Sequence, residues 1–577
     1  MSSILIVLIG FIFFYLGYRF YSKFVSDKIF EINDSSFNVP SKELKDGIDY
    51  LPTKKHILFG HHFTSIAGAA PIIGPCVAAY WGWLPALIWI LLGTVFMGAV
   101  HDFGALVTSV REKGRSIADI ASETISKRAR IMFLIFILFL VWLVLAVFAM
   151  VIADLFVSNP SSVIPINVQI IIAILVGFLM YKKNVEALAP SIIAVGLLYF
   201  FIWIGTHFPV SVDSSLIGLS QRNFWIVALF IYSGIASLLP VWVLLQPRDY
   251  INSHQLFIGL GLLFLGVFIA QPIVEAPAIR SFQGESTPSI FPLLFVTIAC
   301  GAISGFHGLV SSGTSSKQLE KLKDARMVGY GGMIGEGSLA LFSIIAAVAG
   351  ISLVAQTDIP HVSEPIIGMS NWELYYDSWD HARGNKALAF VLGGGKLLQS
   401  LGIPEDFANT LMSVLVISFA ATTLDTATRI QRFIINEFGQ SLKFKPFSNK
   451  YIATLVAVIP AIFLAFWDVA DPTAIAGSTK SAGFVLWPIF GASNQMLAAL
   501  TLMVITIYYW QRKKPILPLL IPMIIIMIIT FISLSQKAMM EFGNNNILFV
   551  LSILLVCLII WMVFEGVIKV LEINKRM

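Results

Sequence analysis

Charge is the scarcest property of this sequence. Only 12% of its 577 residues are charged, whereas 57% are hydrophobic and the mean hydropathy is +0.84. Soluble domains carry about 25% charged residues, so this chain cannot cover a water-facing surface of its own size. The composition excludes a soluble enzyme and predicts an integral membrane protein with many spans of about 20 apolar residues each.

Cysteine is also rare. Cys76, Cys300 and Cys557 all lie in apolar stretches and form no Cys-x-x-Cys pair, which excludes a disulfide framework and a thiolate zinc site. The excess of 38 Lys and Arg over 33 Asp and Glu is small, and in a membrane chain it is interpreted loop by loop. We expect no metal, no cofactor and no nucleic-acid partner.

Apolar stretches of spanning length recur along the whole chain and predict an all-α, polytopic membrane fold with about fifteen transmembrane helices. The expected helices cover residues 4–20, 57–80, 84–110, 131–157, 166–181, 187–206, 224–246, 256–273, 290–312, 333–355, 408–430, 451–466, 481–509, 516–534 and 547–568. We divide the chain into an N-terminal helix with its loop (1–56), a transporter core (57–510) and a C-terminal helix pair (511–577).

Basic residues alternate between the loops. They follow the odd-numbered helices, whereas the loops after even-numbered helices are short, neutral or acidic; the basic positions lie at 111–130, 182–183, 248, 317–326, 443–450 and 512–514. The positive-inside rule then places the N-terminus outside and the C-terminus in the cytoplasm. The segment from Lys386 to Leu401 would disturb this alternation if it spanned, so we expect a re-entrant or interfacial helix there.

Helix-breaking residues crowd the second expected helix. The run HHFTSIAGAAPIIGP (61–75) combines glycines and prolines with polar side chains. Irregular backbone inside a membrane is tolerated only where protein buries it or it lines a cavity, so the run predicts a substrate site; close packing through small residues is the alternative. The candidate residues are His61, His62, Thr64, Ser65, Gly68 and Ala69.

A second run of this kind, CGAISGFHGLVSSGTSSK (300–317), ends the ninth expected helix. Its candidates are Gly305, His307, Gly308 and Ser311. The two runs lie in the second and ninth expected helices, which are seven apart in order, and because seven is odd they cross the membrane in opposite directions. A broken helix repeated in inverted orientation is typical of secondary transporters with inverted repeats.

Two later helices carry polar groups. Thr422, Thr423, Asp425 and Thr426 lie within about two turns. Because residues three and four apart share a helix face, we expect Thr422, Asp425 and Thr426 to point together. The alternative is a solvated pair between Asp425 and Arg429. Asn494 and Gln495 interrupt an apolar helix, and such buried amides require a partner on another helix or on a substrate.

Three further ionisable residues fall inside expected spans near the cytoplasm: His101, Asp102 and Glu336. They are either gate residues or partners of headgroups and loop cations, and the sequence favours neither.

Several of these strings resemble one family. HHFTSIAGAAPIIGP with WGWLPALIWILLGTVFMGAVHDF, SGFHGLVSSGTSSKQ, ATTLDTATR and LWPIFGASNQMLAALTL are similar to the carbon starvation protein A family of bacterial inner-membrane transporters. The resemblance implies uptake of peptides or pyruvate by proton symport when carbon is scarce. It also implies a LeuT-like architecture, in which the broken helices open two inverted five-helix repeats and two further helices are inserted within or between the repeats.

The resemblance also implies roles. The half-helix ends at residues 68–71, with His61, His62 and His307, would bind a substrate carboxylate. The three histidines are also candidate proton carriers, because histidine changes its charge near neutral pH. Thr422 and Thr423 match positions that hold a coupling sodium ion, whereas Asp425 is the candidate if the coupling ion is a proton.

Three other classes compete with a carrier. A channel would show a continuous polar stripe, which the scattered breaks do not provide. A membrane metalloenzyme would need ligands such as His61 and His62 with His101, but no HExxH spacing is present and adjacent helical residues point about 100° apart. A nutrient sensor would carry a signalling domain, and none is recognisable here.

Overall fold

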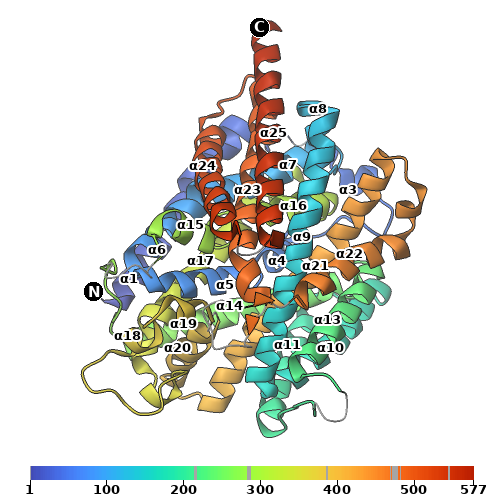
Figure 1. Cartoon of the computed structure of the whole chain (residues 1–577). Helices are drawn as coiled ribbons and strands as arrows, with labels where there is room; N and C mark the ends of the chain where they lie inside the picture. The colour runs from blue at the N-terminus through green and yellow to red at the C-terminus, as the bar shows by residue number, and fades with distance from the viewer. Residues whose placement is uncertain are drawn as a thin grey trace.

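Helices make up nearly all of the described chain. The structure, a computed structural model, describes residues 2–34, 36–213, 218–281, 288–384, 387–467, 469–470, 479–480, 482–543 and 546–576. Within these residues the only sheet is a two-residue antiparallel pair, β1 (Val469–Ala470) with β2 (Thr479–Lys480). The helices stack side by side in one bundle (Figure 1).

Eleven helices of the described chain are long and apolar enough to cross a membrane, and one bent pair, α4 with α5, makes a twelfth. The eleven spans are Ser3–Phe30 (α1 to the following π-helix), Trp83–Arg111 (α6 and α7), Lys127–Ser158 (α9), Pro160–Lys182 (α10), Leu188–His207 (α11), Leu245–Ala270 (α14), Leu322–Val348 (ending in α17), Glu405–Ser441 (α21), Leu486–Gln511 (within α23), Leu517–Glu541 (α24) and Leu548–Lys575 (within α25).

The remaining helices are shorter. They are α3 (Pro40–Glu43), α4 (Lys55–Ile66), α5 (Ala70–Ala78), α8 (Ile117–Thr124), α13 (Gln221–Leu238), α15 (Ile290–Thr297), α16 (Gly305–Gly313), α18 (Asn371–Tyr375), α19 (Trp379–Gly384), α20 (Leu388–Gln399) and α22 (Lys450–Ala465). Within the long spans, α1 proper is Ser3–Leu16, α2 Ser22–Val25, α6 Trp83–Leu92, α7 Ala99–Arg111, α10 Val163–Lys182, α17 Gly332–Val348, α23 Ala482–Gln511 and α25 Asn546–Arg576.

Each of the fifteen expected segments contains helix, but fifteen complete spans are not confirmed. The three that fall outside the set of twelve are α13, the short α22, and the segment that divides into α15 and α16. The first residue of the expected helix 481–509, Ser481, lies outside the described residues.

The predicted boundary between the seventh and eighth expected helices is wrong. The expected helix 224–246 ends at Leu238, and α14 begins at Leu245, well before the expected start at residue 256. Pro247 is tolerated there because the first turn of a helix needs no donor from it. The shift moves the whole polar run 246–253 from an expected loop into a buried helix.

α9 and α21 form the centre of the bundle. Ser126 caps α9 by accepting a hydrogen bond from the Ala129 amide (3.1 Å), which defines where the helix starts. α9 packs against α21, α13, α22, α23 and α8, and most of its side chains are buried. Because protein surrounds it, this very apolar helix is core and not lipid-facing.

The outer helices carry the exposed apolar side chains. Large exposed hydrophobic residues gather on α1, α10, α11, α24 and α25, as expected where lipid replaces water. The C-terminal end of α25 projects at the same end of the molecule as α8, and α18 and α19 lie at the opposite end (Figure 1). The C-terminal pair is not detached from the core, because α24 packs along α23 and α15.

α20 covers most of the segment expected to be re-entrant or interfacial. The helix is too short to span and packs against α21, α17 and α14. It contacts residue 350 closely, since a Cβ on Gly350 would lie 2.7 Å from the carbonyl oxygen of Gly393. Lys386, the first residue of the predicted segment, lies outside the described residues.

Candidate functional site

The second expected helix is broken where its glycine and prolines predict a break. α4 and α5 are bent by 46° across residues 67–69. Ala69 immediately precedes α5, and Pro71 lies in the first turn, where its missing N–H removes no helix hydrogen bond. A Cβ on Gly68 would lie 2.7 Å from Thr423 Oγ1 and 2.8 Å from Phe148 Cε2. The break is therefore packed directly against α21 and α9.

The ninth expected helix is broken as well. α15 ends at Thr297 and α16 begins at Gly305, and residues 298–304 between them are not helical. A Cβ on Gly305 would lie 2.4 Å from both the carbonyl oxygen of Asn494 and the Cβ of Leu497. Only glycine lets the start of α16 approach the α23 backbone this closely.

The two broken helices run in opposite directions. At one end, Trp81 Nε1 donates to the carbonyl of Pro288 (2.8 Å), and at the other the Thr53 amide donates to the carbonyl of Gln318 (3.0 Å). Between these ends, a Cβ on Gly74 would lie 2.5 Å from the Thr297 carbonyl oxygen. The start of each segment thus lies beside the end of the other, which is the arrangement that an inverted pair predicts.

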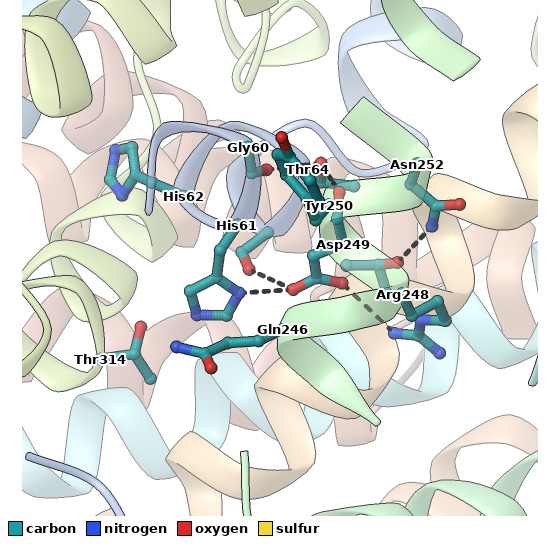
Figure 2. Close-up of polar contacts among 12 residues, drawn as sticks. Gly60, His61, His62, Thr64, Gln246, Arg248, Asp249, Tyr250, Asn252 and Thr314 are labelled. Carbon is teal, nitrogen blue, oxygen red and sulfur yellow. Dashed lines mark hydrogen bonds and ion pairs between the residues drawn. The ribbon is translucent and has the colours of Figure 1, made fainter. Parts of the chain in front are cut away.

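His61 and His62 leave α4 on different sides, as their helical spacing predicts (Figure 2). His61 Nδ1 lies 2.6 Å from Asp249 Oδ2 on α14, and His62 Nδ1 lies 2.8 Å from Ser315 Oγ, just after α16. Both rings are fully buried, and the Nε2 atom of each has no hydrogen-bond partner within the described chain. Both residues lie on α4, five and six residues before the break begins at residue 67.

Thr64 and Ser65 of α4 form hydrogen bonds to α14. Thr64 Oγ1 donates to the carbonyls of Gly60 (2.7 Å) and Asp249 (3.0 Å). Ser65 Oγ donates to Asp249 Oδ2 at 3.3 Å. Asp249 therefore organises the polar face of the first half-helix, and Figure 2 shows the His61 ring pointing at its carboxylate.

A buried ion pair extends this network to α21. Arg248 Nη1 lies 2.5 Å from Asp425 Oδ2, which also accepts a hydrogen bond from the Tyr232 hydroxyl (2.8 Å). Arg248 Nη2 is 3.8 Å from Asp249 Oδ1. One guanidinium, 2% exposed, thus faces two fully buried carboxylates.

Two corrections follow from this pair. The sequence predicts Arg248 in a basic cytoplasmic loop, and this prediction is wrong. Arg248 is a buried residue of α14, so its charge carries no information about the orientation in the membrane. Asp425 does not form the solvated pair with Arg429 that was the alternative. Arg429 is itself buried, with Nη1 3.5 Å from Asp49 Oδ1.

The predicted shared face of α21 is confirmed for Thr422 and Asp425, which both contact α14. Thr422 Oγ1 accepts a hydrogen bond from Asn252 Nδ2 at 3.0 Å. Thr423 instead meets the first break, where its Oγ1 donates to the carbonyl of Ser65 at 3.5 Å. Of Thr422 and Thr423, it is therefore Thr423 that lies beside a carbonyl of the first broken helix. The sodium site that the family resemblance implies needs such a carbonyl next to a threonine hydroxyl.

Four buried titratable residues form a second network at α16. His307 Nδ1 lies 2.9 Å from Asp102 Oδ2, and its Nε2 lies 3.2 Å from Glu336 Oε2. His101 Nδ1 lies 2.7 Å from Asp102 Oδ1. All four side chains are fully buried, so Asp102, Glu336 and His101 are not partners of headgroups or loop cations. Gly308 lies against this group, because a Cβ there would be 3.1 Å from the His101 ring.

Asn494 and Gln495 have partners on the second broken helix. Asn494 Oδ1 accepts a hydrogen bond from the Phe306 amide (2.9 Å) and so caps the start of α16. Its Nδ2 donates to Ser304 Oγ (2.9 Å), and Gln495 Nε2 donates to the carbonyl of Phe295 (2.8 Å). The sequence left open whether these amides contact another helix or a substrate, and in the structure both contact the second broken helix. Ser311, also predicted, is buried on α16 with its Oγ unpartnered within the described chain.

The candidate metal ligands of a metalloenzyme do not converge at the breaks. Among the described residues, one trio of His, Cys, Asp or Glu side chains brings its ligand atoms within 4.8 Å of one another: His361, Asp377 and His381. This trio lies in the loop region between α17 and α20, remote in sequence from His61 and His62. Two of its members are exposed.

Sequence reasoning missed four residues of the first network: Tyr232, Arg248, Asp249 and Asn252. A signal for them exists in the run QPRDYINSH (246–254), where polar residues recur at helical spacing after a proline that suits a first helical turn. The charge of Arg248 instead favours the prediction of a cytoplasmic loop, which hides this helical spacing.

Comparison with known proteins identifies close relatives along the whole chain. The model of the family described as carbon starvation protein CstA matches residues 2–533. Peptide transporter CstA of Helicobacter pylori strain J99 is 34% identical, covering 92% of this chain and 81% of that protein. Peptide transporter CstA of Bacillus subtilis strain 168 is 32% identical, with coverages of 91% and 88%. Pyruvate/proton symporter BtsT of Escherichia coli K12 is 30% identical, with coverages of 89% and 78%.

Solved structures with a related arrangement of helices are far more distant. A manganese transporter of Eremococcus coleocola aligns with a TM-score of 0.47 at 14% identity, covering 92% of this chain and 99% of that chain. MhsT in complex with L-phenylalanine aligns with a TM-score of 0.46 at 12% identity, with coverages of 84% and 99%.

Proposed function

Since this chain belongs to the carbon starvation protein CstA family and is a multi-pass membrane transporter, not an enzyme, we propose that it imports a small carboxylate nutrient, pyruvate or a peptide, by ion symport. The membrane is the bacterial inner membrane, and the setting is carbon starvation. The N-terminus lies outside and the C-terminus in the cytoplasm. The core is a LeuT-like inverted repeat.

The observation that carries this proposal is the meeting of two oppositely directed broken helices in a fully buried region. The half-helix start at residues 68–71 provides a positive dipole end for a carboxylate. His61 Nε2, His62 Nε2 and Ser311 Oγ are buried polar atoms without protein partners in the described chain. Substrate bound there contacts both breaks, so moving one half-helix exposes it to one side of the membrane.

Gly305, Gly308, Asn494 and Gln495 contribute indirectly to this site. The glycines allow α16 to lie against α23 and His101, and the amides hold the second break. Thr422, Thr423 and Asp425 form the side of the site on α21. We propose that Thr423 and the Ser65 carbonyl would bind a sodium ion if sodium is coupled, and Asp425 is one candidate for a proton.

A polar layer beside the starts of α4 and α14 supports an inner gate. Gln246 Nε2 contacts Thr53 Oγ1 (3.3 Å) and Gln318, and the Tyr181 hydroxyl donates to Gln246 Oε1 (2.5 Å). Lys317, which belongs to one of the basic loops, adjoins Gln318 of this layer in sequence. We propose that these contacts close the cytoplasmic side and separate when substrate is released.

Uptake in proteoliposomes tests this function. Labelled pyruvate and a labelled dipeptide are offered under an imposed proton gradient or an imposed sodium gradient. We expect accumulation above equilibrium of at least one substrate, abolished when the gradient is collapsed. Equilibration without accumulation would favour a channel, and binding without uptake would favour a sensor.

The site itself is tested by His62→Ala. We expect a raised KM for uptake because the Nε2 atom on the first half-helix is removed. The control is His207→Ala, at the exposed end of α11, which should behave as the wild type. Unchanged kinetics in both variants would show that His62 is a packing residue.

A further inference from the structure

The network of His101, Asp102, His307 and Glu336 joins three helices. Asp102 and His101 come from α7, His307 from α16 and Glu336 from α17. α16 is the half of the second broken helix that follows the break. His307 is therefore a link between a broken helix and two continuous ones.

Each of the two contacts between the His307 ring and a carboxylate requires a proton between its nitrogen and oxygen atoms. Both ring nitrogens face carboxylates, Nδ1 at 2.9 Å and Nε2 at 3.2 Å. A neutral imidazole has one N–H, so its other nitrogen would direct a lone pair at a carboxylate oxygen. With both carboxylates ionised, the favourable form of His307 is the imidazolium.

Counting charge then leaves the network one proton short of neutrality. Two carboxylates and one imidazolium sum to one negative charge, and Asp102 also accepts a hydrogen bond from His101 Nδ1. An uncompensated charge is costly in the membrane interior. Among the described residues, the groups on other elements that lie beside this network include no Lys or Arg: α4 contributes His62, whose ring lies against Gly332, and α23 contributes Thr501 beside Gly308.

Glu336 is the carboxylate that would receive the missing proton. Neither of its oxygens has a hydrogen-bond donor within the described chain besides the ion-pair contact with His307. Asp102, in contrast, contacts one imidazole through each oxygen. In the other network, Asp425 Oδ2 accepts from Arg248 and Tyr232, and Asp249 Oδ2 contacts His61 and Ser65. A carboxylate with fewer donors loses less when it is protonated.

We propose that the His307–Glu336–Asp102 group is the binding site of the coupling proton, with Glu336 as its principal acceptor. The proton adds to a Glu336 carboxylate oxygen from one side of the membrane and leaves to the other, and no other bond is made or broken. Movement of α16 changes the distance between His307 and Glu336, which links proton binding to the alternation of the site. This inference rests on the proposed function.

The test separates coupling from transport. Purified protein is reconstituted, and two assays with labelled substrate are compared: accumulation driven by a proton gradient, and exchange against unlabelled internal substrate at equal pH on both sides. A pH-sensitive dye inside the vesicles records proton entry when substrate is added. For Glu336→Gln, which keeps the shape and removes the acid, we expect accumulation and proton entry at the level of protein-free vesicles, with exchange close to wild type.

Matched variants complete the test. Glu437→Gln is the control, because Glu437 also lies in a helix and accepts a hydrogen bond from Ser116 (2.8 Å) but belongs to neither network. Asp102→Asn is an independent second variant, expected to reduce accumulation more than exchange. If Glu336→Gln does not fold, as judged by size-exclusion chromatography in detergent, Asp102→Asn alone decides the question.

Each outcome is decisive. Accumulation and proton entry unchanged in Glu336→Gln would overturn the inference, as would the same loss of coupling in Asp425→Asn with Glu336→Gln unaffected. Equal loss of accumulation and exchange in a well-folded Glu336→Gln would also overturn it, because the group would then act on the substrate. A wild-type protein that neither exchanges nor accumulates either substrate refutes the proposed function instead.

Discussion

Two groups of buried charges in this protein each hold more carboxylates than permanent cations. Arg248 faces Asp425 and Asp249, and His307 faces Asp102 and Glu336. Removing one member of a buried pair leaves the others without compensation, and that cost exceeds the contribution of the pair itself. At the scale of single residues, these groups therefore serve both stability and transport.

Replacing the guanidinium of Arg248 should show this directly. Arg248→Gln leaves two buried carboxylates without their counter-charge, so we expect a loss of about 3–5 kcal/mol of stability. The measurement is the thermal unfolding transition of purified protein in detergent.

The control for that substitution is Arg222→Gln. Arg222 pairs with Asp154 at 2.6 Å, but both side chains are partly exposed, and such a pair contributes about 0–1 kcal/mol. Equal shifts in the two variants would contradict the view that the Arg248 pair is held in a low-dielectric interior.

Among the elements, the broken helices depend on close backbone contacts. Gly68 and Gly305 lie where a Cβ would be under 3 Å from α21, α9 or α23. The sequence predicted both breaks because glycine and proline interrupt helices for local reasons. It could not predict that Asn494 of α23 caps α16, because that contact joins residues far apart in the chain.

The contact at Gly305 can be tested by adding one methyl group. In Gly305→Ala the new Cβ meets the α23 backbone, which cannot move aside as a side chain can, so we expect about 1–3 kcal/mol of destabilisation and a loss of uptake. Thermal unfolding and the transport assay measure the two effects.

Gly261→Ala is the matched control, since a Cβ at that position of α14 would meet nothing within 4 Å. Alanine favours a helix over glycine by about 0.5–1 kcal/mol, so this variant should be as stable as the wild type or slightly more so. Wild-type transport by Gly305→Ala would show that α16 does not need its close approach to α23.

For the whole molecule, the orientation remains a prediction from loop charge. Without Arg248 the remaining basic loops still alternate, since their residues lie at 111–130, 182–183, 317–326, 443–450 and 512–514. Ser3 at the start of α1 donates to the carbonyl of Pro272, just beyond α14 (2.8 Å), so the start of α1 and the end of α14 lie at the same end of the bundle, as the expected order of helices requires.

Cysteine labelling in intact cells tests the orientation. In a Cys557→Ser background, where the two remaining cysteines are buried, single cysteines replace the exposed Ser363 and Ser448. We expect a membrane-impermeant maleimide to label Ser363→Cys and to label Ser448→Cys only after the cells are permeabilised. The reverse pattern would invert the proposed topology.

The sequence by itself determined that this chain spans a membrane many times, that two helices are broken, and that histidines and hydroxyls lie beside the breaks. These properties follow from composition and local spacing, because each residue's preference acts within a few neighbours. Only the tertiary structure decided which charges meet. It placed Arg248 inside α14 against Asp425, and it brought Asp102 and Glu336 to His307, since contacts across helices depend on packing that no local pattern records. The low charge content identifies a membrane protein, and in such an interior an unpaired charge is costly. The few buried charges are therefore paired with one another across helices.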